Sequence, residues 1–388
     1  MNNFALAAYL SWKEIWRNRG RFFLVSLVIA LITLLVLFIA ALGEGLGNAN
    51  RQYISRLDAD LLIYLEKSDF VIPSSRVERS AIRVVRRVEG VANAGGIVAS
   101  STAILLNGED EILNVSLLGI EPGRPGDPPV VEGRRISGEQ ARETVIDRNV
   151  ALRSNIKVGD IITVRSTQGT RDEFFDLRVV GLAEGQQYFF QPSIFVPYAT
   201  WDRVRTKSDA ERGQASSTVN VIAVRLAEGH TREEVSAQLT ARISNIAIAD
   251  IQTAIENVPG YSAQQSTVQT QAVFTLLIGV LVIGGFFQIQ ILQKVPQIGV
   301  LKAIGASNAM VGLSSVMQII ITTTLGVALG SALAFTFSFF FPPTVPIVFD
   351  GISSAVAIVA LLLIGPLGGL VSIFYAVRIE PLKALRLS

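Results

Sequence analysis

The stretch FFLVSLVIALITLLVLFIAAL, residues 22–42, decides the fold of this chain. It holds 21 residues without a charge. A helix needs roughly 20 apolar residues to cross the hydrocarbon core of a bilayer, and it satisfies its own backbone hydrogen bonds there. Three similar stretches follow at residues 271–293, 312–340 and 352–377. The sequence therefore predicts an α-helical membrane protein with four spanning helices, one before and three after a long polar region.

The polar region, residues 43–270, predicts one large α+β domain between the first and second spans. Residues 60–65 and 219–226 have strand-like composition. Each is followed by a Ser/Thr-x-x-Glu capping box, beginning at Ser75 and at Thr231, which predicts a helix start. Two strand–helix units that flank an insert indicate a split βαβ, porter-like part.

The insert between these two units is predicted to be rich in β-structure and to cover about residues 120–213. Within it, Gln168-Gly169 separates two strand-like runs and predicts a hairpin turn. The Pro- and Gly-rich segment at residues 119–129 is the predicted hinge into the insert.

The composition excludes several classes of function. Only 17% of the residues are charged and the formal net charge is +2, so we expect no nucleic-acid partner. The chain has no cysteine and a single histidine, His230. No GxxxxGK[ST], GxSxG or HExxH motif occurs. We therefore predict no catalytic residue, no metal site and no cofactor on this chain, which is not expected to be an enzyme.

Basic residues near the ends of the spans predict the orientation. They cluster in the N-terminal segment, in the loop after the second span and in the C-terminal tail (Lys13, Arg17, Arg19, Arg21, Lys294, Lys302, Arg378, Lys383 and Arg386). With four spans all three clusters fall on one side. Both termini of this multi-pass protein are then cytoplasmic, in the cell (inner) membrane, and the large domain is extracytoplasmic.

Two alternatives stay open at the N-terminus. Residues 1–21 are predicted to form a cytoplasmic amphipathic elbow helix at the interface, with Trp12 and Trp16 at headgroup level; the alternative is a plain extension of the first span. Residues 22–42 are longer than a signal-peptide core, so we expect a retained span rather than cleavage after Ala41.

Small residues recur along the later spans and predict close helix packing, because they let backbones approach. The candidates are Gly284, Gly285, Gly326, Gly330, Gly365 and Gly369. No charge lies inside any span. A polar pathway through the membrane usually needs ionisable groups, so the sequence argues against a channel or a secondary transporter.

The segment QIGVLKAIGAS, residues 297–307, resembles the EIGxLKAxGAS segment of ABC transporter permeases of the MacB/FtsX type (type VII, mechanotransmission-like). Other parts of the chain resemble the same family: WKEIWRNRGR at residues 12–21, Gly-Asp-x-Ile at residues 159–162 and EPLKALR at residues 380–386. One departure is Pro296-Gln297, where the family often has Arg-Glu.

The resemblance implies that residues 294–311 form a cytoplasmic coupling segment that docks on a separate ABC ATPase subunit, which binds ATP and Mg. Its candidate contacts are Gln297, Ile298, Gly299, Leu301, Lys302, Ile304 and Gly305. Ile298, Leu301 and Ile304 are expected to form one apolar face, and Lys302 to meet an acidic patch. Residues 378–388 form a cytoplasmic tail.

The resemblance also implies the function. A homodimer with two ATPase chains would move its outer domains and drive the export of a lipid, peptide or drug-like substrate from the periplasm or outer leaflet. A periplasmic adaptor, an outer-membrane duct and membrane lipid are possible partners. The alternative function is that of an FtsX-like transmembrane signalling subunit that activates a cell-wall hydrolase.

Overall fold

The computed structural model describes residues 3–106, 111–211, 213–342 and 345–378. The chain divides into two compact units. One is helical and comprises Met1–Gly45 and Gln265–Ser388; the other comprises Leu46–Gln264 and is mostly β-structure. Residues 379–388, and with them most of the predicted tail, lie outside the described part. The sequence also predicts a hairpin turn at Asn107-Gly108, and these residues lie outside the described part as well.

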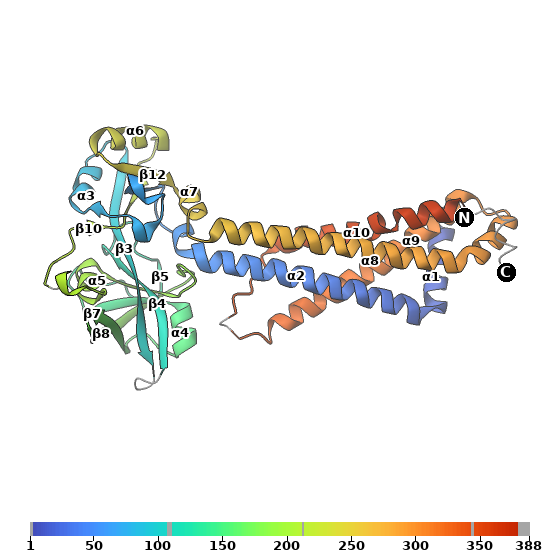
Figure 1. Ribbon diagram of the computed structural model, residues 1–388, viewed down its shortest axis with the longest axis horizontal. Coiled ribbons are helices and arrows are strands. Elements are labelled where there is room, and N and C mark those ends of the chain that lie inside the picture. The colour runs from blue at the N-terminus through green and yellow to red at the C-terminus, as the bar shows by residue number, and fades with distance from the viewer. Residues whose placement is uncertain (1–2, 107–110, 212, 343–344, 379–388) are drawn as a thin grey trace. The chain divides into compact units, whose positions relative to one another are not determined.

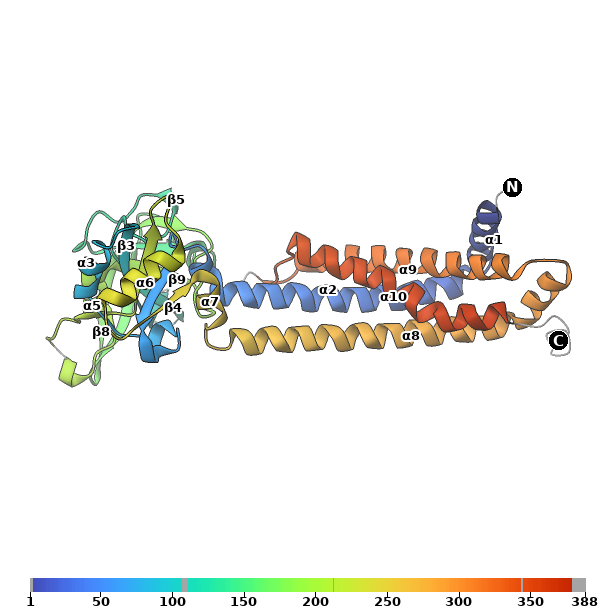
Figure 2. The same cartoon turned by 90° about the horizontal axis from the view of Figure 1, so that it is seen from above.

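In the part of the chain that the structure describes, four helices are long and apolar enough to cross a membrane: α2 (Arg19–Ser55), α8 (Tyr261–Ala303), α9 (Asn308–Ser338) and α10 (Gly351–Val377). Each predicted span lies within, or nearly within, one of them. In the helical unit they run side by side (Figures 1 and 2). α9 and α10 begin at side-chain caps, where Ser307 and Asp350 accept backbone N–H bonds.

The N-terminal segment forms a separate helix, α1 (Asn3–Arg17), which ends before α2 begins at Arg19. In Figure 2 α1 crosses the direction of α2. Its Ser11 is fully buried and donates to the carbonyl of Ser314 in α9 over 3.0 Å. Trp12 and Trp16 are 56% and 67% exposed and their rings stack at 6.4 Å. This break favours the elbow over a plain extension of the first span.

The second unit contains the predicted split βαβ part. Its strands are β1 (Leu61–Leu65), β3 (Val91–Leu106), β11 (Val221–Leu226) and β12 (Ile246–Asp250). They pair in the order β12-β1-β11-β3, every neighbour antiparallel. The helix α3 (Ser80–Val85) connects β1 to β3, and α6 (Arg232–Arg242) connects β11 to β12. This is the connectivity of two interleaved βαβ units.

The strands from β4 to β9 continue the same sheet, because β3 is shared. Residues 91–97 of β3 pair with β11, whereas residues 98–106 pair with β4 (Glu111–Ile120). The other strands are β5 (Val130–Gly133), β6 (Glu143–Asp147), β7 (Ile161–Gln168), β8 (Arg171–Ala183) and β9 (Ser193–Pro197), with helices α4 (Arg148–Ser154) and α5 (Tyr198–Val204). The second part of the sheet thus begins in β3, earlier than the predicted hinge at residues 119–129.

At β1 both faces of the sheet are buried. In β1, Leu61 and Ile63 belong to one apolar cluster with α3 and α6, while Leu62 and Tyr64 belong to a second cluster. Alternate residues of a strand point to opposite faces. The last turns of α2 and the short helix α7 (Ile251–Glu256) cover the second face. The continuous apolar run of β1 is typical of a strand buried on both sides.

One predicted helix start is wrong and another is confirmed. The Ser75 side chain accepts the backbone N–H of Leu65 over 2.9 Å, and residues 77–78 form the short strand β2 (Val77–Glu78) with β10 (Thr218–Val219). The helix α3 begins only at Ser80, because strand pairing competes for the backbone before it. Thr231, in contrast, caps α6 in a complete capping box. The Gln168-Gly169 hairpin is also confirmed, with Gly169 at φ +63°.

Candidate coupling site

The segment after residue 294 is the end of α8 and not a separate short helix. α8 continues through Pro296 to Ala303. The backbone N–H of Gly305 then bonds to the carbonyl of Lys302, and that of Ala306 to the carbonyl of Leu301, both over 3.0 Å. With Gly305 at φ +107°, this is the Schellman arrangement that ends helices with a left-handed residue. Four residues separate the end of α8 at Ala303 from the start of α9 at Asn308, so the connection between these helices is short and has a defined conformation.

Apolar side chains are exposed at this helix end. Val300, Leu301 and Ile304 are 45%, 39% and 81% exposed. Ile298 differs from the predicted apolar face: it is 8% exposed and packs with Ile291 in a small cluster that includes Val311 of α9 and Ala376 of α10. Positions 298 and 304 lie about 120° apart around the helix, so the apolar surface runs from the buried side at Ile298 to the exposed side at Ile304. Val300, Leu301 and Ile304 therefore form the exposed apolar tip. Compared with the predicted face, the tip includes Val300 and does not include Ile298.

The other predicted coupling residues take different positions. Gln297 is exposed, Gly299 is buried and Gly305 is exposed. The ammonium group of Lys302 donates to the carbonyl of Val377, at the end of α10, over 2.7 Å. A cation at a helix C-terminus is favourable because unpaired carbonyls accumulate there. Lys302 thus contacts its own chain, which the prediction of an acidic partner patch did not include.

A polar cluster beside the tip joins three helices. Lys294 of α8 is 9% exposed and lies 2.5 Å from the carboxylate of Glu14 in α1. The same ammonium donates to Gln318 Oε1 of α9 over 2.9 Å, and Gln318 Nε2 donates to Glu14 over 2.5 Å. All three side chains thus bond to one another. They line a cavity of about 340 Å³ together with Lys13, Arg17, Gln297 and Leu301.

The sequence does not predict this cluster. Lys294 is among the basic residues that predict the orientation, and Gln318 lies in the predicted span 312–340 without being singled out. Their partner Glu14 is 280 positions or more away along the chain. The sequence does contain one signal. Glu14 is the single acidic residue of the N-terminal segment, and an amphipathic helix at the membrane interface does not require an acidic residue there.

The glycines mark where the helices approach. A Cβ atom added at Gly284 of α8 would lie 2.7 Å from the carbonyl oxygen of Gly368 in α10, and one at Gly326 of α9 would lie 2.6 Å from Ile29 Cβ in α2. Gly330 faces the carbonyl of Ala30 in α2 even more closely. Close approach of this kind leaves no room for a side chain.

The remaining predicted glycines fall into two groups, those that lie against a neighbouring helix and one that does not. Gly365 and Gly369 of α10 face Thr323 and Ile319 of α9 at distances that exclude a Cβ. Gly285 has no heavy atom within 4 Å of an added Cβ among the described residues. It follows Gly284 in α8 and is turned by about 100° from it, which removes it from the contact with α10. On the α10 side the contact with Gly284 is made by Gly368, which was not among the predicted glycines.

Comparison with known proteins agrees with this architecture. The family model of the MacB-like periplasmic core domain matches residues 22–242, and that of the FtsX-like permease C-terminal domain matches residues 271–381. The protein is thus a permease of the ABC transporter class. The chain belongs to the family in which a MacB-like periplasmic core domain is followed by an FtsX-like permease domain.

The named relatives have low sequence identity to this chain, but the matches cover most of its length. The putative hemin transport system permease protein HrtB of Staphylococcus haemolyticus is 23% identical over 97% of this chain and 98% of its own length. The macrolide export ATP-binding/permease protein MacB of Escherichia coli K12 is 24% identical over 88% of this chain and 51% of its own length. This chain therefore spans about half of MacB. The periplasmic region of MacB from Actinobacillus actinomycetemcomitans aligns with a TM-score of 0.38 at 14% identity, covering 52% of this chain and 94% of that one.

The two family models confirm the fold class and the family resemblance. The protein has four apolar spanning helices, one before and three after a large extracytoplasmic α+β domain. The multi-pass membrane character follows from the same findings.

Proposed function

We propose that this chain is the permease subunit of an ABC exporter whose ATPase is a separate chain, and that the exposed apolar tip of α8 is where the ATPase docks. The observation that carries the proposal is the tip itself: Leu301 and Ile304 are exposed on a helix end that a Schellman motif fixes in place. Exposed apolar side chains next to polar surroundings favour a protein contact.

The connection from this tip to the outer domain is a single helix. α8 starts at Tyr261 and ends at Ala303 without interruption, a length of 43 residues or about 65 Å. A helix transmits displacement along its axis because its hydrogen bonds resist stretching. Movement of Leu301 by an ATPase would therefore reach the chain that enters the extracytoplasmic domain. The Glu14–Lys294–Gln318 cluster would make α1 and α9 move with it.

Two relatives supply the expected partners and substrate. HrtB is named as a permease protein of a hemin transport system and matches this chain almost end to end, whereas MacB, twice as long, is named as an ATP-binding/permease protein. A separate ATPase for this chain fits the first pattern, and we propose two copies of each chain in the complex. The substrate is proposed to be a lipid, a peptide or a drug- or hemin-like amphiphile taken from the extracytoplasmic side or the outer leaflet, with an adaptor and duct where an outer membrane exists.

The test introduces a charge at the tip. Leu301→Asp and Ile304→Asp should weaken association with the co-purified ATPase by roughly 30- to 1000-fold, since desolvating a carboxylate in an apolar interface costs on the order of 2–4 kcal/mol. Both side chains are exposed, so expression and membrane insertion should be unchanged. Association is measured by co-purification from native membranes, with ATP turnover of the complex as a second readout.

Asn18→Asp is the matched control. It adds the same charge outside residues 294–311, directly before α2 begins at Arg19, where an acidic side chain is favourable. It removes no apolar side chain and should bind the ATPase like the native chain. Native association in both tip variants would contradict docking at this tip. ATP hydrolysis by the isolated permease would contradict the separate ATPase.

A further inference from the structure

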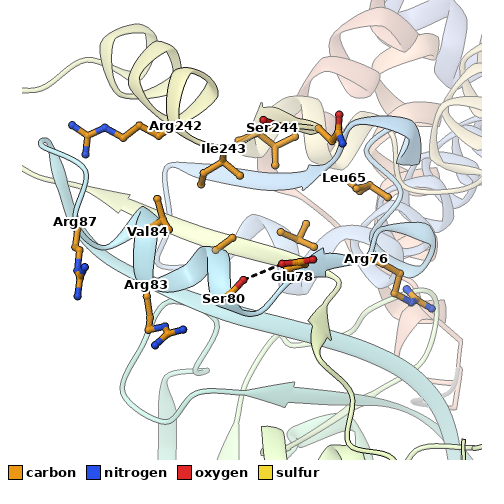
Figure 3. A pocket seen from close by; sticks show the side chains of 14 residues that line it. Leu65, Arg76, Glu78, Ser80, Arg83, Val84, Arg87, Arg242, Ile243 and Ser244 are labelled. Atoms are coloured by element: carbon orange, nitrogen blue, oxygen red, sulfur yellow. Dashed lines mark hydrogen bonds between the residues drawn. The ribbon is translucent and has the colours of Figure 1, made fainter.

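A pocket of about 800 Å³ lies in the extracytoplasmic unit, between α3 and the segment that joins α6 to β12 (Figure 3). Its wall includes Val84 of α3 and Ile243 at the end of α6, which face each other across the pocket in the figure. Val84 is 40% exposed. Leu65, Val77 and Ile246 add further apolar surface. The pocket thus has an apolar base large enough for a small organic molecule.

Four arginines line the same pocket: Arg76, Arg83, Arg87 and Arg242. Glu78 is the single acidic residue among the described residues of the lining, and it accepts a hydrogen bond from the Ser80 hydroxyl over 3.1 Å. Arg76 donates to the carbonyls of Pro73 and Ser75, both over 2.7 Å. The positive charge of the pocket is therefore far from balanced by its own residues.

Three of these guanidinium groups have no partner in the part of the chain that the structure describes. Arg83, Arg87 and Arg242 make neither an ion pair nor a side-chain hydrogen bond there. Some exposed arginines of the same unit are paired, as Arg134 is with Glu143 and Arg225 with Asp58, whereas Arg171 and Arg178 of β8 make no ion pair among the described residues. Arg83 and Arg87 come from α3 and the turn after it, whereas Arg242 comes from the opposite side, at the end of α6. In Figure 3 the three guanidinium groups point in different directions, so they form a positively charged rim and not a single cradle. Unpaired guanidinium groups are suited to binding a carboxylate or phosphate.

We propose that this pocket is a binding site for an anion with an apolar body: a carboxylate or phosphate attracted to the positive rim that Arg83, Arg87 and Arg242 form, and a ring or chain that covers Val84 and Ile243. The volume exceeds what a bare phosphate fills, and the apolar base would stay wet without a ligand. The site lies in the extracytoplasmic domain and does not depend on where the ATPase docks.

Binding is tested with the full chain in phosphatidylcholine nanodiscs, with empty nanodiscs as the background. The probe is 1-naphthyl phosphate, compared with inorganic phosphate, which lacks the ring, and 1-naphthol, which lacks the charge. We expect 1-naphthyl phosphate to bind at least tenfold more tightly than either one. Equal affinity for inorganic phosphate would overturn the apolar part of the proposal, and equal affinity for 1-naphthol would overturn the anionic part.

The variant Arg83→Gln/Arg87→Gln should weaken binding of 1-naphthyl phosphate by tenfold or more, because two charge-assisted hydrogen bonds are lost. The matched control is Arg171→Gln/Arg178→Gln, which removes the same charge from exposed positions of β8. It should bind like the native chain. Equal weakening in both doubles would overturn the site in favour of a general charge effect, and no weakening in the first would overturn it directly.

Two further variants separate the contributions. Arg83→Lys/Arg87→Lys keeps the charge but loses the planar fork, and should fall between the native chain and the Gln double. Val84→Thr keeps the shape but adds a hydroxyl, and should weaken 1-naphthyl phosphate by several-fold while leaving inorganic phosphate unchanged. Unchanged naphthyl binding in Val84→Thr would contradict contact of the ring with α3.

Discussion

At the level of single residues, Lys294 shows how a charge is accommodated at the end of an apolar helix. Its ammonium is almost buried, and Glu14 and Gln318 both bond to it. Burying an ion pair gives little net stability, because desolvation offsets the attraction. Removing one partner is costly, however, because the other charge is left without compensation. The cluster therefore fixes where α1 lies against α8 and α9 more than it adds to stability.

Replacing Lys294 by Met tests this account. Lys294→Met leaves the Glu14 carboxylate without its counter-ion, and we expect a loss of about 1–3 kcal/mol, less than for a fully buried pair because Glu14 is partly exposed. The apparent midpoint of thermal unfolding in detergent should fall by several degrees. The double variant Glu14→Gln/Lys294→Met should recover most of the loss. A double variant as unstable as the single one would contradict a role for the unpaired charge.

At the level of elements, contacts between helices depend on which side of a helix a glycine faces. Gly284 and Gly285 are neighbours in α8, yet only Gly284 lies against α10. The sequence predicted a helix contact at both glycines, because it reveals where small residues occur. It does not reveal how an apolar helix is rotated about its axis, and so which glycine faces a neighbour. α2, α8, α9 and α10 are apolar on nearly all sides, so no polar stripe indicates which face is buried.

The substitutions Gly330→Ala and Gly285→Ala should therefore act in opposite directions. At Gly330 a methyl group meets the backbone carbonyl of Ala30, which cannot move aside without shifting α2. Overpacking of this kind costs typically about 1–3 kcal/mol. At Gly285 the space is open, and alanine favours the helix by up to about 1 kcal/mol. Thermal unfolding of both variants in the same detergent gives the comparison; destabilisation of equal size would show that the α2–α9 contact is not specific.

In the sheet, features that depend on adjacent residues were predicted from the sequence, whereas features that depend on distant pairing partners were not. The capping box at Thr231, the hairpin at Gln168-Gly169 and the double-sided burial of β1 all follow from a few adjacent residues. The failure at Ser75 came from β10, a partner about 140 residues later in the chain that draws residues 77–78 into a strand. The shared strand β3 was missed for the same reason, since pairing partners are not local.

For the whole molecule, the order of the parts was predictable because the bilayer restricts it. Long uncharged runs must be helices there, and the polar region between the first two must fold by itself. The contacts that join the N-terminal helix to α8 and α9 were not predictable, since Ser11 and Glu14 meet residues about 300 positions away. Composition near a span predicts on which side of the membrane it ends, but not which helix it touches.

The orientation of the whole chain is the last prediction. Basic residues near the ends of the spans place Asn308 in the cytoplasm and Glu228 outside, and with four spans both termini share one side. The native chain has no cysteine, so Asn308→Cys and Glu228→Cys each give one thiol at an exposed position. A membrane-impermeant maleimide should label Glu228→Cys in intact cells, and Asn308→Cys only after permeabilisation. Labelling of Asn308→Cys in intact cells would reverse the orientation and exclude the α8 tip from any contact with a cytoplasmic ATPase.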